Sequence, residues 1–218
     1  MFGLRLYPPA PGSGGTDAQD VPPVERAGAW SEGQAQKILA SVERTRPAGL
    51  RDYAILLLLY TFGVRSGQVR ALRLDDIHWS ENRILLRAMK NGKDIWLPLT
   101  VAVGEALLGY LQQGRPACAC SQVFLTARAP YRCLRRSSNV AQIVRHYAHK
   151  AGIDAPRQGA HAFRHGFATR MLRQGHSLKA IADVLGHRRL STTFGYTKVD
   201  FDRLEEVALA WPEETPSC

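Results

Sequence analysis

The chain has 218 residues, of which 45% are hydrophobic and 22% charged, so it can form one domain with a sizeable core. Its 29 basic and 19 acidic residues give a formal charge of +10. An excess of this size favours a polyanionic partner, either nucleic acid or an anionic membrane surface, although composition alone leaves open a merely soluble basic protein. The longest wholly apolar run, Ala54 to Leu59, is far too short to span a bilayer, which makes nucleic acid the better candidate of the two.

The cysteines and the N-terminal sequence indicate the cellular compartment in which the protein works. The four cysteines, at positions 118, 120, 133 and 218, show no Cys-x-x-Cys spacing and no matched set of histidines. This pattern is typical of reduced thiols in a cytosolic protein and argues against a zinc site. The N-terminus also lacks the basic start, apolar run and cleavage site of a signal peptide. We therefore expect a cytoplasmic protein without a metal ion or other cofactor.

The first half of the chain opens with a stretch of unusual composition. Residues 1–29 are rich in proline and glycine and show no period, which predicts a flexible tail. A helix is expected from Ser31 to about Arg44, ended by the Pro-Ala-Gly sequence at 47–49. The strongly apolar segment 52–62 then predicts a buried helix that Gly63 ends.

The middle of the chain changes from helical to extended patterns. Two short apolar segments, 84–89 and 94–99, flank the turn Lys-Asn-Gly-Lys at 90–93, and Asn-Gly is a strong hairpin signal because both residues tolerate positive φ. Further helices are expected over 101–113 and from about 139 to 151.

An irregular basic stretch separates these two helices. Residues 117–138 contain Tyr131 and four arginines, which are Arg128, Arg132, Arg135 and Arg136. Basic side chains with an interleaved aromatic residue can contact a DNA backbone, and a solvated loop is the open alternative.

The segment that begins at His161 has the period of an amphipathic helix. His161 and Arg164 lie three residues apart and therefore on one helical face. Phe163, Phe167 and Met171 recur every four residues and predict a buried stripe.

A second helix is predicted directly after it, over residues 178–185. Gly186 is suited to the left-handed turn that ends a helix, and His187 follows immediately. Tyr196 stands nine residues further on, after a Ser-Thr-Thr run. Histidines, an arginine and a tyrosine gathered around helix ends would form a phosphate site.

These pieces resemble the catalytic box of the tyrosine recombinases, also called the phage-integrase family. The family pattern is His-x-x-Arg, Leu-Gly-His and Thr-Thr-x-x-Tyr, which stand here at 161–164, 185–187 and 192–196. One such motif recurs by chance, whereas the ordered set is specific. The resemblance covers about residues 31–211. It implies a mainly helical α+β catalytic domain with a small antiparallel sheet or hairpin packed on a helical core.

The resemblance extends to the first arginine motif of the family, Gly-hydrophobic-Arg-x-Ser-Glu. Arg65 takes the arginine position. Gly67 and Gln68 stand where Ser-Glu is usual, a departure that bears on the local hydrogen bonds bracing Arg65 but not on its charge.

The family also carries a catalytic lysine on a hairpin, eight residues before a proline. Lys90 and Pro98 fit this spacing, so Lys90 is the candidate. Lys93 lies across the same turn and is assigned a phosphate contact instead; an ordinary solubilising turn charge is the alternative for either lysine.

The resemblance implies cleavage and rejoining of DNA strands through a 3′-phosphotyrosine. In such a site two arginines clamp the phosphate, two histidines donate hydrogen bonds or move protons, a lysine protonates the leaving 5′ oxygen, and a tyrosine attacks. The residues in these roles are, in that order, Arg65 and Arg164, His161 and His187, Lys90, and Tyr196.

The implied partner is double-stranded DNA, bound by a tetramer on paired sites that forms from monomers, with no membrane involved and with a location at the nucleoid. Residues 30–218 would be the catalytic domain, and the helical N-terminal core-binding domain of most members is absent, as in a short member or a fragment. Two other functions stay open: a DNA-binding relic or regulator without activity, and a type IB topoisomerase-like relaxing enzyme.

Overall fold

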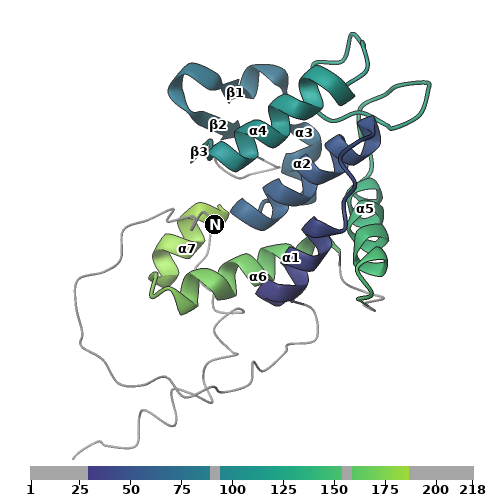
Figure 1. Cartoon of the computed structure of the whole chain (residues 1–218). Helices are drawn as coiled ribbons and strands as arrows, with labels where there is room; N and C mark the ends of the chain where they lie inside the picture. Colours follow the sequence, from purple (N-terminus) through teal and green to yellow (C-terminus); the bar gives the residue numbers. More distant parts are fainter. Residues whose placement is uncertain (1–28, 89–93, 154–158, 187–218) are drawn as a thin grey trace, which may run out of the picture.

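The computed structural model describes residues 29–88, 94–153 and 159–186. Figure 1 shows a mainly helical body with a small sheet at one side, which confirms the expected fold class. The predicted tail, apart from Ala29, lies outside the described residues. In chain order the helices and strands are α1 (Glu32–Ala40), α2 (Pro47–Phe62), α3 (Ser66–Ala71), β1 (Ile77–His78), β2 (Arg83–Leu86), β3 (Ile95–Pro98), α4 (Val101–Gly109), α5 (Ser137–Lys150), α6 (Ala160–Arg173) and α7 (Leu178–Leu185).

Helix α2 lies at the centre of the molecule, between α4 on one side and α1 and α6 on the other (Figure 1). Its residues 54–59 are all buried, as expected for a helix that is apolar on every face. Gly63 ends it with φ +59°, and a Cβ there would lie only 2.7 Å from the ring of Phe167 in α6. The close approach of α6 therefore requires glycine at this position.

The sequence prediction was wrong about where the first two helices end and begin. The first helix stops at Ala40, short of Arg44, and Pro47 begins α2 rather than breaking a helix. Proline suits this position because its missing N–H would have no partner in the first turn. Gly49 lies inside α2, where a Cβ would overlap the carbonyl oxygen of Glu43.

The start of α1 is fixed by a capping box. Gln34 donates its backbone N–H to Ser31 Oγ at 3.2 Å, and Ser31 donates its own to Gln34 Oε1 at 3.0 Å. Trp30, just before, is buried against Phe163 of α6, with ring centroids 6.2 Å apart. The chain thus enters the domain against the helix that carries the His-x-x-Arg motif.

The sheet is antiparallel, with strand order β1-β2-β3. The predicted hairpin is confirmed by the pairing of β2 with β3, from Arg83 opposite Pro98 to Leu86 opposite Ile95. The additional strand β1 was not predicted, because two residues are too few to show an alternating pattern. Ile84, Leu86 and Leu97 point into the core. The turn 89–93 lies outside the described residues.

Candidate active site

Three separate chain segments meet at the carboxyl end of α7. Arg164, on α6, donates from Nη2 to the carbonyl oxygen of Leu185 at 2.7 Å and from Nη1 to that of Gly63 at 2.9 Å. Arg65, between α2 and α3, donates from Nη1 to the same oxygen of Leu185 at 3.4 Å. The structure therefore brings together the two arginines that were assigned the phosphate clamp.

The backbone around Arg65 is held by Gln68. The N–H of Arg65 donates to Gln68 Oε1 at 3.1 Å, and the N–H of Gln68 donates to the carbonyl oxygen of Arg65 at 2.9 Å. Gln68 is buried. The amide oxygen thus offers an acceptor for the same kind of bond that a carboxylate would accept. At position 68 the departure from the family's Ser-Glu therefore keeps an acceptor for the backbone N–H of Arg65.

Gly186 sets how closely the end of α7 approaches its neighbours. It adopts φ +62°, and a Cβ there would lie 2.5 Å from Ile95 Cδ1 and 4.0 Å from Arg65 Nη1. A side chain at position 186 would therefore force the end of the Ile95 side chain to move. Because Ile95 begins the strand that follows the turn 90–93, the base of the hairpin that carries both candidate lysines lies at this site.

The other predicted catalytic residues divide into two groups. His161 is exposed in the first turn of α6, one turn before Arg164. His187 directly follows Gly186, but it lies outside the described residues, as do Lys90, Lys93 and Tyr196.

Two positive charges share one small region of this site. Arg164 is only 3% exposed, Arg65 is half-buried, and both point at a carbonyl of the last turn of α7. The negative end of the helix dipole offsets part of this charge. No carboxylate pairs with Arg65 among the residues that the structure describes. An anion that accepts bonds from two guanidinium groups would complete the arrangement.

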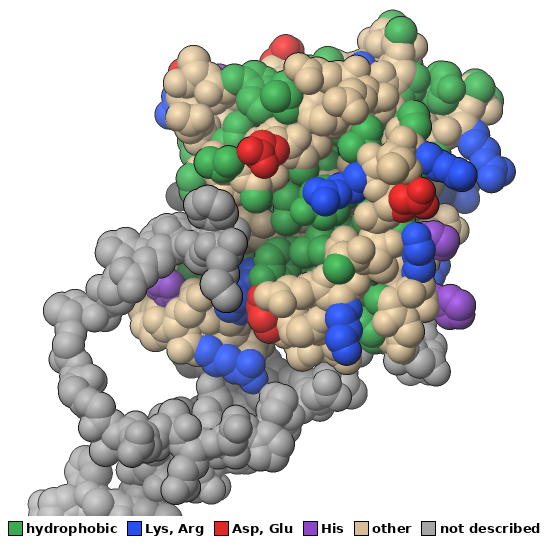
Figure 2. Space-filling view, in the orientation of Figure 1, with side chains coloured by type: hydrophobic (Ala, Val, Ile, Leu, Met, Phe, Trp, Pro, Cys, Tyr) green, Lys and Arg blue, Asp and Glu red, His purple; other side chains and the backbone are tan. Residues whose placement is uncertain are grey.

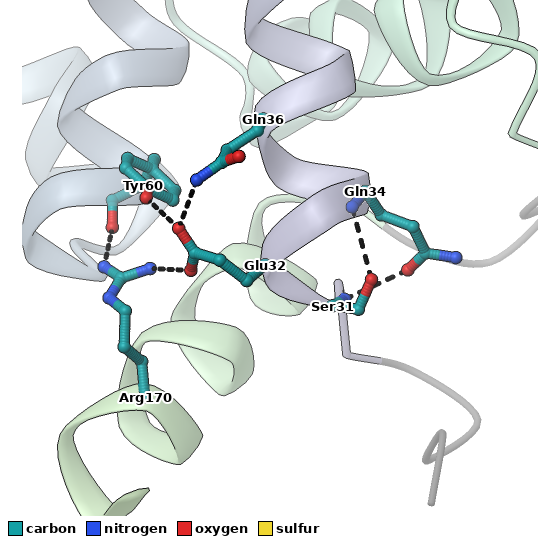
Figure 3. Close-up of polar contacts among 6 residues, drawn as sticks. All are labelled: Ser31, Glu32, Gln34, Gln36, Tyr60 and Arg170. Atoms are coloured by element: carbon teal, nitrogen blue, oxygen red, sulfur yellow. Dashed lines mark hydrogen bonds and ion pairs between the residues drawn. The ribbon is translucent and has the colours of Figure 1, made fainter. Parts of the chain in front are cut away.

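A polar cluster that sequence patterns did not reveal holds α6 in place (Figure 3). Arg170 of α6 donates to Glu32 Oε2 at 3.1 Å and to the carbonyl oxygen of Tyr60 at 2.7 Å, and its guanidinium lies 4.4 Å from the Tyr60 ring centre. The Tyr60 hydroxyl donates to Glu32, as does Gln36 at 2.9 Å. These bonds join α1, α2 and α6 and so fix the helix that presents Arg164.

Glu32 accepts bonds from all three of these partners. Burial alone would raise the pKa of its carboxyl, but the hydrogen bonds from Tyr60, Arg170 and Gln36 and the Arg170 charge outweigh burial and lower this pKa below its usual 4.5.

The four arginines of the basic stretch are all exposed. Thr126 closes the turn that carries Arg128 and Arg132, since its Oγ1 accepts from the N–H of Arg132 at 3.1 Å and its N–H donates to the carbonyl oxygen of Arg132 at 2.8 Å. Arg135 accepts a bond from Arg70 through its carbonyl oxygen, and Arg136 directly precedes α5. Lys and Arg side chains are seen at several places on the face shown in Figure 2. The four guanidinium groups are therefore accessible to solvent.

The described residues contain neither a membrane-spanning helix nor a cluster of metal ligands. No helix there is both long and apolar enough to cross a membrane. No group of three or more His, Cys, Asp or Glu side chains in the described ranges is arranged to hold a metal ion.

The sequence of the chain is similar to those of known proteins. The sequence model of the phage integrase family matches residues 30–203. The integrase/recombinase y4rA of Sinorhizobium fredii is 47% identical over 178 residues, which are 82% of this chain and 43% of that protein. The integrase/recombinase y4gC of the same organism is 43% identical over 82% of this chain and 93% of its own length. The chain belongs to the phage integrase family, the tyrosine recombinases, and the described part is the catalytic domain of that family.

A solved structure has the same fold. The XerH site-specific recombinase, in a post-cleavage complex with a palindromic difH substrate, superposes with a TM-score of 0.68 at 23% identity. The match covers 86% of this chain and 54% of XerH. The chain thus spans about half the length of XerH and less than half of y4rA.

Proposed function

We propose that this chain is a site-specific DNA recombinase that cleaves and rejoins DNA strands through a 3′-phosphotyrosine intermediate. The observation that carries the proposal is the convergence of Arg65 and Arg164 on the carbonyl oxygen of Leu185, directly before Gly186 and His187. A guanidinium remains charged at physiological pH and can donate to two phosphate oxygens at once. Two of them at one helix end suit an anionic phosphodiester.

The reaction would pass through an in-line displacement at phosphorus. Tyr196 would give its phenolic proton to one of the two histidines in its neutral form as Oη forms a bond to phosphorus. The bond from phosphorus to the 5′ oxygen breaks at the same time, and Lys90 gives its proton to that oxygen. Negative charge grows on the non-bridging oxygens, where Arg65 and Arg164 stabilise it. Rejoining is the same sequence in reverse. The energy of the broken bond is kept in the phosphotyrosine, so no ATP is needed.

The two histidines would complete the contacts to the phosphate. His161 and His187 can each donate a hydrogen bond to a non-bridging oxygen, or exchange protons near neutral pH. The exposure of His161 on the first turn of α6 leaves it accessible to bound DNA.

DNA binding would use positive charges outside the reaction centre. Lys93 of the hairpin turn and the exposed arginines before α5 are assigned to phosphates of the duplex, where they release counterions and make the affinity depend on salt. These arginines are Arg128, Arg132, Arg135 and Arg136.

The assembly would follow that of related recombinases bound to DNA. XerH is solved with its difH substrate. We assign to this chain a tetramer on two paired DNA sites, formed from monomers, with residues 200–211 docking into a neighbouring copy. Its place of action would be the nucleoid in the cytoplasm.

The test is a nicked suicide DNA substrate built from sequence that flanks the gene, since loss of the cleaved fragment traps the covalent adduct. The wild-type protein should carry the DNA on Tyr196, detected by mass spectrometry of its peptides. Tyr196→Phe should form none, whereas Tyr53→Phe, a change in the first half of α2 at a tyrosine with no assigned role, should still form it. An adduct that persists in Tyr196→Phe would disprove the proposed nucleophile.

A further inference from the structure

Two cysteines of the basic stretch lie in direct contact. Cys118 Sγ and Cys120 Sγ are 3.1 Å apart, and both residues are partly exposed to solvent. A disulfide bond has a sulfur–sulfur distance of about 2.05 Å, so the two atoms need to approach by only about 1 Å.

The backbone on one side of this pair is held firmly. Arg115 donates to the carbonyl oxygens of Cys120 at 2.6 Å, Gln122 at 3.0 Å and Val123 at 3.1 Å. The strand-like bridge between Arg73 and Gln122 adds a second anchor. Cys120 therefore has a fixed place, and Cys118, two residues earlier, faces it.

The third described cysteine is engaged differently. Cys133 Sγ donates to Gln122 Oε1 at 3.0 Å, and its backbone pairs with Leu125. Cys218 lies outside the described residues. Cys133 is therefore a matched control for the pair, because it lies on the same stretch and makes a different contact.

We propose that Cys118 and Cys120 form a reversible dithiol that a low-molecular-weight disulfide oxidises to an intramolecular disulfide. One cysteine thiolate attacks a sulfur of the external disulfide, forming a mixed disulfide and releasing one thiol. The second cysteine then attacks the sulfur of its neighbour and releases the other thiol. In total the pair loses two protons and two electrons, and the external disulfide takes them up and is reduced to two thiols.

Oxidation of the cysteine pair would affect the turn that carries Arg128 and Arg132. Cys118 Sγ also lies 3.8 Å from the carbonyl oxygen of Tyr131, at the outer limit of an S–H contact, and Tyr131 lies in the turn between Arg128 and Arg132. A disulfide has no S–H, so this contact is lost on oxidation. This consequence rests on the proposed function. The affinity for DNA falls when the pair is oxidised, because the turn that carries Arg128 and Arg132 is held less firmly.

The first experiment detects the bond itself. The reduced full-length chain is treated with excess glutathione disulfide, free thiols are alkylated, and tryptic peptides are weighed. Trypsin cuts after Lys93 and Arg128 but not before Pro116, so one peptide holds both cysteines and Cys133 falls in another.

In the wild type and in Cys133→Ser, that peptide should lose two hydrogen atoms and take up no alkylating agent. In Cys118→Ser it should instead gain one glutathione on Cys120. The proposal is overturned if the wild-type peptide keeps two alkylatable thiols, carries only glutathione, or is joined to the peptide of Cys133.

The second experiment measures whether the affinity for DNA changes when the disulfide forms. Fluorescence anisotropy with labelled duplex DNA should show a several-fold weaker affinity for the oxidised wild type, restored by dithiothreitol, and no such change in Cys118→Ser. An affinity that stays the same although the disulfide has formed would overturn the link to DNA. Absence of DNA binding in both states would contradict the proposed function and leave the disulfide, which is measured by mass, unaffected.

Discussion

At the scale of single residues, Arg164 has two roles that its motif does not distinguish. Its guanidinium is directed toward the proposed phosphate site, yet it also joins the end of α2, through Gly63, to the end of α7, through Leu185. Sequence reasoning predicts that Arg164→Ala abolishes cleavage and leaves the fold intact. The buried position of the side chain makes a loss of stability part of the expected result.

Arg164→Ala leaves two carbonyl oxygens without this donor, so the free energy of unfolding should fall by roughly 1–3 kcal/mol while cleavage is lost. Urea denaturation measures the first effect and the suicide-substrate assay the second. Arg65→Ala is the matched control. Arg65 is half-buried, and its side chain donates one long bond, at 3.4 Å, within the described residues, so cleavage should be lost with a clearly smaller change in stability. Full cleavage by either variant would contradict the proposal that the two arginines bind the phosphate.

A second residue, Gly186, is required for both its backbone conformation and its contacts. Gly186→Ala should cost about 1–2 kcal/mol for the left-handed φ alone, and more because the new Cβ meets Ile95. Gly175→Ala is the control, since Gly175 also has a positive φ but a Cβ added there would have no neighbour within 4 Å. Thermal unfolding should show the larger loss for Gly186→Ala. Equal losses would mean that the contact with β3 contributes nothing.

At the scale of elements, the cluster of Glu32, Tyr60 and Arg170 determines how α6 lies on α1 and α2. Because the pKa of Glu32 is lower in the folded protein than in the unfolded chain, its contribution to stability is complete above about pH 4.5 and declines as the pH falls through the folded-state value.

Glu32→Gln should therefore be less stable than the wild type at neutral pH, and the difference should shrink below about pH 4.5. Denaturant unfolding over a series of pH values measures it. Glu105→Gln, at an exposed position of α4, serves as the control and should follow the wild type. A difference that grows on acidification would show that the sign of the Glu32 pKa shift is wrong.

At the scale of the whole molecule, the proposed chemistry relies on protein cations rather than on a metal ion. The described residues offer no group of ligands for a metal, whereas Arg65 and Arg164 supply positive charge at the proposed phosphate position. Formation of the Tyr196 adduct should therefore proceed at an unchanged rate in excess EDTA. Loss of the adduct on chelation, restored by added Mg²⁺, would contradict this mechanism.

Several features of the protein could be determined from its sequence alone because each depends on neighbours along the chain. The helical period around His161 and Arg164, the hairpin signal at 90–93 and the ends of helices at Gly63 and Gly186 are local properties, and the structure has the helices, the paired strands and both glycine turns where they were expected. The wrong prediction at Pro47 is also local in origin, since proline ends one helix as readily as it begins the next.

Only the tertiary structure decided what these elements place together. Arg65 and Arg164 meet at the carbonyl oxygen of Leu185, and Arg170 on α6 reaches Glu32 on α1, although no residue pattern marks either contact. A backbone carbonyl is present at every position of a sequence, so which one accepts a hydrogen bond depends on how the helices pack. The residues that form the site can therefore be recognised from their order along the chain, but their mutual distances follow from the buried cores that hold α6 against α2 and against α7.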